Sequence, residues 1–115
     1  MKEFILLVQG PVSYSPETAK AVGPQWDIVT NKWKEENRFV ISHVFPGESF
    51  IISGTERTTG SGPTVSNNLK QVSCIVLRAA DMQDAIAQAK LCPVLDHGGA
   101  IEVREAPPRP IPVSK

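Results

Sequence analysis

The sequence lacks an excess of either charge: 12 Lys and Arg residues are matched by 12 Asp and Glu residues, for a net charge of zero. Proteins that bind nucleic acid usually carry a basic excess, because neutralising phosphates supplies their sequence-independent affinity. The sequence therefore predicts no nucleic-acid partner.

Long apolar runs and clustered cysteines are also missing. The apolar run of residues 4–8 is too short for a signal-peptide core or a membrane span, so we expect no membrane partner and a cytoplasmic location. The two cysteines lie in no CxxC or Cys/His cluster, which argues against a disulfide scaffold or a structural zinc site. Cys74, inside the apolar run of residues 72–77, is expected to be a buried small hydrophobe. With no glycine-rich nucleotide motif either, we expect no cofactor.

A chain of 115 residues fits one domain, which we place at residues 1–105. Residues 106–115 hold four prolines and are expected to form an extended tail. Apolar patterning and turn residues predict the following elements: a strand at 4–8, a helix from 16 to about 36, strands at 39–45 and 50–53 forming a hairpin, a long loop or edge strand at 54–68, a strand at 71–77, a helix opening at 82, and a strand at 100–104. Pro24 predicts a kink in the first helix or a restart there.

This order is the split βαβ pattern of a ferredoxin-like fold, an α+β domain with an antiparallel sheet and two helices on one face. The first and third main strands are nevertheless apolar on both faces. Burying a large aliphatic side chain contributes roughly 1.5–3 kcal/mol, so an uncovered apolar face favours a homodimer in which two sheets pack face to face.

Residues 79–93 (AADMQDAIAQAKLCP) and 98–104 (GGAIEVR) resemble the C-terminal signature of YCII-related (DGPF-type) proteins, and residues 1–7 and 15–17 match the family's opening. The resemblance implies a dimeric α+β barrel. Members often carry Asp-Gly-Pro-Phe near the long loop, where this chain has Ser-Gly-Pro-Thr at residues 61–64. Related proteins have been proposed to use a His and an Asp in a cleft, and this chain lacks that Asp.

Three residues are candidates for acid–base chemistry: His43, His97 and Asp96. His43 lies in the alternating set Phe39, Ile41, His43 and Phe45, which should share one face of a strand. It is either a core or interface histidine or a general base in a cleft near the dimer interface. Asp96 and His97 are adjacent, so they could form a dyad only if Gly98-Gly99 supplies a turn; otherwise they belong to a polar loop.

Arg57 and Ser61 are candidates for ligand binding, because a loop with an arginine and hydroxyl groups could hold an anion. A solvated loop is the simpler interpretation. Trp26 could stack on a ligand, although its place in a helical apolar stripe favours the core.

Two functional hypotheses follow. The first is a homodimeric module that binds a small molecule or has a regulatory role. The second is a small cofactor-free enzyme, an isomerase or lyase acting on a small organic acid, that uses His43 with help from His97 and Asp96.

Overall fold

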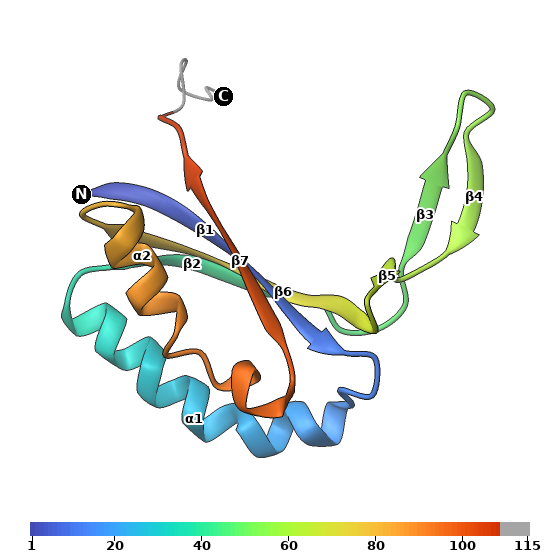
Figure 1. Ribbon diagram of the computed structural model, residues 1–115. Helices are drawn as coiled ribbons and strands as arrows, with labels where there is room; N and C mark the ends of the chain where they lie inside the picture. Colours follow the sequence, from blue (N-terminus) through green and yellow to red (C-terminus); the bar gives the residue numbers. More distant parts are fainter. Residues whose placement is uncertain (109–115) are drawn as a thin grey trace.

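A computed structural model describes residues 1–108 and shows an α+β fold with an antiparallel sheet and two α-helices (Figure 1). The elements, in chain order, are β1 (Lys2–Pro11), α1 (Pro16–Glu35), β2 (Phe39–Val44), β3 (Phe50–Ser53), β4 (Thr58–Ser61), β5 (Val65–Ser66), β6 (Leu69–Ala79), α2 (Met82–Ala89), the 3-10 helix η1 (Pro93–His97) and β7 (Ala100–Ala106). The predicted order of main strands and helices is confirmed.

The main sheet has the strand order β2-β6-β1-β7, with the short β5 paired to one end of β6. All its neighbouring strands are antiparallel, and the order is compatible with a ferredoxin-like arrangement. β7 runs to Ala106, one residue into the predicted tail. The rest of the Pro-rich segment, from residue 109 on, lies outside the described residues.

Both helices begin where the sequence predicts, at residues whose side chains cap them. The hydroxyl of Ser15 accepts a hydrogen bond from the backbone N–H of Thr18 (3.1 Å), and Asp81 accepts one from the N–H of Asp84 (2.9 Å). Helix α1 continues through Pro24, so the helix does not restart there.

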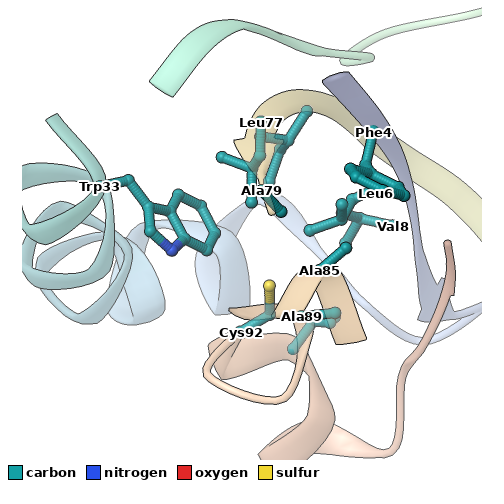
Figure 2. Packing of buried hydrophobic residues seen from close by; sticks show 11 residues of the cluster. Phe4, Leu6, Val8, Trp33, Leu77, Ala79, Ala85, Ala89 and Cys92 are labelled. Atoms are coloured by element: carbon teal, nitrogen blue, oxygen red, sulfur yellow. The ribbon is translucent and has the colours of Figure 1, made fainter. Parts of the chain in front are cut away.

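The core lies between the helices and one face of the sheet (Figure 2). Alternate residues of β1 point into it, because successive side chains of a strand lie on opposite faces. The fully buried members with the largest side chains are Trp33 of α1, Phe4, Leu6 and Val8 of β1, Leu77 of β6, Val22 of α1 and Val94 of η1. Small residues of α2, Ala85 and Ala89, let that helix lie close to the sheet.

The face of β2 differs from the prediction, because the strand contains a bulge. Phe39 pairs with Leu77 and Ile41 pairs with Val76, which leaves Val40 as the extra residue. Since Leu77 and Val76 point to opposite faces, Phe39 packs against the core whereas Ile41 lies on the other face. The prediction that Phe39 shares a face with Ile41 and His43 was therefore wrong.

The segment after β2 also differs from the prediction. β3 pairs with β4 rather than with β2, and residues 54–68, for which the sequence allowed a loop or an edge strand, contain the strands β4 and β5. The β3–β4 hairpin forms a sheet of its own and rises from the main sheet on the side away from the helices (Figure 1). We call residues 45–64, the hairpin and its two connections, the arm.

Candidate functional site

Among residues 1–108, no helix covers one face of the sheet (Figure 1), and the centre of this face is apolar. Ile5 and Leu7 of β1 pair with Val76 and Cys74 of β6, and Val76 pairs in turn with Ile41 of β2. All five side chains are half-buried or exposed, in contrast to the buried residues between them in the sequence. We call this side of the sheet the open face. It consists of these five residues and of His43, Glu102 and Arg104 beside them.

Polar side chains border this apolar centre. On β7, Glu102 and Arg104 lie opposite Leu7 and Ile5, and they form an ion pair with each other (2.9 Å). On the other edge, His43 of β2 lies directly opposite Cys74. Residues facing each other in an antiparallel pair have Cβ atoms about 5 Å apart, so the imidazole and the thiol are neighbours.

The two cysteines have different surroundings, and both thiols are free. Cys74 is partly exposed on the open face, so the expectation of a buried hydrophobe was wrong for it. Cys92 is the buried cysteine, and burial raises the pKa of its thiol to about 12. Of the two thiols, the accessible one is therefore Cys74, beside His43.

His97 and Asp96 lie in a different part of the fold from His43. Both are exposed at the end of η1, a short helix that contacts α1 and β1. Gly98 follows in the left-handed conformation (φ 83°) and ends the helix. Within residues 1–108 the structure has no side-chain hydrogen bond between Asp96 and His97, and it does not bring either one to His43.

The three candidate ligand-binding residues are likewise separated. Arg57 lies in the turn of the arm, where its guanidinium donates to the backbone oxygen of Thr55 (3.0 Å). Ser61 is the exposed last residue of β4, and the peptide bond between Gly62 and Pro63 beyond it is cis. Trp26 packs against the core from α1.

An apolar groove with a volume of about 410 Å³ runs between α2, η1 and β7, on the helical side of the sheet. Its lining combines six apolar residues with one cation: Met82, Ile86, Ala89, Lys90, Leu95, Ile101 and Val103. This size falls within the range of small-molecule sites, which are mostly apolar with a few polar groups that orient the ligand. The groove is thus an open apolar surface with one charged residue, Lys90, in its lining.

A network of ion pairs joins the end of α1 to the start of α2, apart from both the groove and the open face. Arg38 pairs with Asp84 (2.8 Å) and with Glu36 (2.7 Å). The N–H of Ala80 and the Arg38 guanidinium both donate to the Asp84 carboxylate, and together they lower its pKa to about 2. Hydrogen bonds from Lys32 and Arg38 lower the pKa of Glu36. These shifted groups stabilise the fold.

Among residues 1–108, no three His, Cys, Asp or Glu side chains are grouped so that they could hold a metal ion. No helix within the same residues combines the length and apolar character needed to cross a membrane.

Neither a scan against protein-family models nor a search of curated proteins found a match to this chain. The resemblance of residues 79–104 to YCII-related proteins thus stays a prediction.

Sequence reasoning missed both the groove and the pairing of His43 with Cys74. The groove residues of α2 are visible in the sequence as a helical stripe containing Met82, Ile86 and Ala89, which would ordinarily be read as core. The pairing of His43 with Cys74 depends on the bulge at Val40, and no local signal marks that bulge.

Proposed function

We propose that the protein is a cytoplasmic homodimer of the YCII-related, dimeric α+β barrel type that binds a small amphipathic acid without a cofactor. The observation that carries the proposal is the apolar groove of about 410 Å³ beside α2, with Lys90 as the charged residue of its lining. The groove offers apolar contacts to the body of the ligand and an ammonium group to its carboxylate.

The homodimer is supported by the open face. No helix of the described part of the chain, residues 1–108, covers its apolar centre of Ile5, Leu7, Ile41, Cys74 and Val76. A contiguous apolar patch bordered by polar groups is typical of an interaction surface. A second copy related by a two-fold axis would cover the patch with the same patch.

Native mass spectrometry of the freshly purified protein tests both parts of the proposal. We expect the mass of a dimer, and an added small mass wherever a ligand has co-purified. A monomer at micromolar concentration contradicts the homodimer.

The groove is tested with a defined probe, octanoate, and with the uncharged octanol of the same chain length. Lys90→Gln should weaken octanoate binding about fivefold, equivalent to about 1 kcal/mol for an exposed ion pair, and leave octanol binding unchanged. Lys20→Gln, at an exposed position of α1, is the matched control and should change neither. If Lys90→Gln weakens octanoate and octanol binding equally, or if the unmodified protein binds neither, the groove is not a site for amphipathic acids.

The alternative proposal is a cofactor-free isomerase or lyase acting on a small organic acid, and the placement of His43 opposite Cys74 on the open face favours it. In this proposal His43 takes a proton from the carbon next to the substrate carbonyl, in a cleft closed by the second subunit. The test is proton–deuterium exchange at that carbon, followed by NMR over a panel of small 2-oxo acids. Exchange that is lost in His43→Ala supports the enzyme, and a rate no faster than buffer across the panel contradicts it.

A further inference from the structure

The arm is the most exposed part of the fold. Every residue from 41 to 61 is exposed, and β3 and β4 pair with each other and with no strand of the main sheet. The radius of gyration, 15.7 Å, exceeds the roughly 13 Å expected for a compact chain of this length, in part because the arm stands away from the sheet (Figure 1).

The exposed apolar side chains are concentrated in and next to this arm. Among residues 1–108, seven of the twelve large hydrophobic side chains that are exposed lie between residues 41 and 65: Ile41, Val44, Phe45, Phe50, Ile51, Ile52 and Val65. Phe50 is 62% exposed and Ile52 is 68% exposed. Such a concentration differs from the single exposed hydrophobic residues that are normal on protein surfaces.

An isolated hairpin of this kind needs a cover. Two strands alone are marginally stable in water, and a third strand or a packed layer is normally required. Neither β3 (FIIS) nor β4 (TTGS) carries a charged residue that would keep their free edges from pairing with other chains.

We infer that the arm packs against a second copy of this chain that is seated on the open face, so that each subunit of the dimer is held by the arm of the other. The inference rests on the homodimer proposed above. It adds that the arm, and not the open face alone, stabilises the dimer.

The position of the arm favours a second copy as its occupant. The arm rises on the side of the sheet away from the helices, which is the side of the open face (Figure 1). A partner lying on the open face would therefore also meet the arm. The two surfaces are continuous, because Ile41 and His43 of β2 lie on the open face and the chain enters the arm at Phe45.

The area required for a stable dimer points to the same occupant. Four strands about 4.8 Å apart, taken over the seven residues Glu3–Gln9 of β1, give the open face a flat extent of about 450 Å². A stable interface of standard size buries about 800 Å² on each partner. The flat extent of the open face is about half of this value, and the apolar side chains of the arm supply further surface to a partner seated there.

The test is sedimentation equilibrium of the full chain over a range of concentrations. Phe50→Ser/Ile52→Ser should weaken dimerisation at least about 30-fold, because each dimer loses the apolar contacts of two arms. Ile28→Ser is the matched control: Ile28 is 71% exposed on α1, and its replacement should leave the dimer unchanged.

The outcomes separate this inference from the proposed homodimer. An unmodified protein that is monomeric throughout overturns both, and binding of that monomer to anionic vesicles through the arm would identify a membrane as the occupant instead. If the Phe50→Ser/Ile52→Ser variant dimerises as tightly as the unmodified protein, the inference about the arm is wrong, whereas the proposed homodimer is unaffected.

Hydrogen exchange of the unmodified protein gives a second test that needs no variant to fold. The amides of β3 and β4 should exchange more slowly above the dissociation constant of the dimer than below it. Exchange in the arm that is independent of concentration, in a protein that does dimerise, overturns the inference.

Discussion

The indole Nε1 of Trp33 donates a hydrogen bond to the side-chain Oε1 of Gln88 (3.1 Å), and this bond links α1 to α2 across 55 residues of sequence. Both residues are buried, and Gln88 is the one buried polar residue among residues 1–108. The Gln88 amide also donates to Asp84 (3.3 Å), which joins the buried bond to the ion pairs around Arg38.

Replacing Gln88 by leucine should lower the free energy of unfolding by about 2 kcal/mol, because the Trp33 N–H is then buried without an acceptor. Urea denaturation at one fixed protein concentration measures the change, since dimerisation would make stability depend on concentration. In a double-mutant cycle, Trp33→Phe/Gln88→Leu should lose about 1 kcal/mol less than the sum of the single variants. Additive losses would show that the hydrogen bond contributes nothing.

The Asp84 carboxylate should make stability depend on pH in the acid range. Its pKa is lowered in the folded state from 3.8 to about 2, so its contribution is present above pH 4 and is lost as the pH falls towards 2. The side chain is 22% exposed, and with solvent screening we expect a contribution of about 1–2 kcal/mol.

Acid titration of Asp84→Asn tests this dependence. The difference in the free energy of unfolding between the unmodified protein and this variant (the stability gap) should narrow as the pH falls from 5 to 2. A gap that stays constant over this range would contradict the role of the Asp84 ion pair.

The two cysteines should react at very different rates with iodoacetamide in the folded protein. Cys74 is partly exposed and should be alkylated, whereas the buried Cys92 thiol, with its pKa of about 12, should react only after denaturation. Mass spectrometry of the labelled protein identifies the site, and Cys74→Ser should abolish native labelling. Alkylation of Cys74 should also slow as the protein concentration rises, because the proposed dimer covers the open face.

Replacing Gly99 or Gly23 by alanine should change the free energy of unfolding in opposite directions. A Cβ at Gly99 would lie 2.5 Å from the backbone oxygen of Gln9 and 2.6 Å from Val94 Cγ2, so Gly99→Ala should lose about 2 kcal/mol or more. A Cβ at Gly23, inside α1, meets nothing within 4 Å, and Gly23→Ala should gain about 0.5–1 kcal/mol. Thermal or urea unfolding measures both, and equal effects would contradict this account of the packing.

The order of main strands and helices could be predicted because each element carries its own local signal. Ser15 and Asp81 are caps, and the continuous apolar run of residues 4–8, closed by Gly10-Pro11, marks a strand. The pairing of β3 could not be predicted in the same way. The sequence of Phe50–Ser53 is typical of a strand, but it does not indicate whether that strand pairs with β2 or with β4. The pairing with β4 is visible only in the structure.

The candidate site was harder to predict than the fold. Its parts come from separate elements, such as Met82 of α2 with Val103 of β7, or His43 of β2 with Cys74 of β6. Adjacent polar residues, which attract notice in a sequence, were poor guides: Asp96 and His97 end a short helix and share no side-chain hydrogen bond. Only the sheet topology brings the distant residues together.

Because Val40 is an extra residue in β2, Phe39 and Ile41 lie on opposite faces of the sheet although they are two residues apart. Upstream of it Phe39 faces the helices, and downstream of it Ile41 and His43 face the other way. Deleting Val40 would leave Phe39 opposite Leu77 and Ile41 opposite Val76 in regular alternation, so His43 would keep its place on the open face and only the local distortion of the bulge would be lost. The bulge thus lets Phe39 and Ile41, two apolar residues spaced two apart, serve opposite faces of one strand.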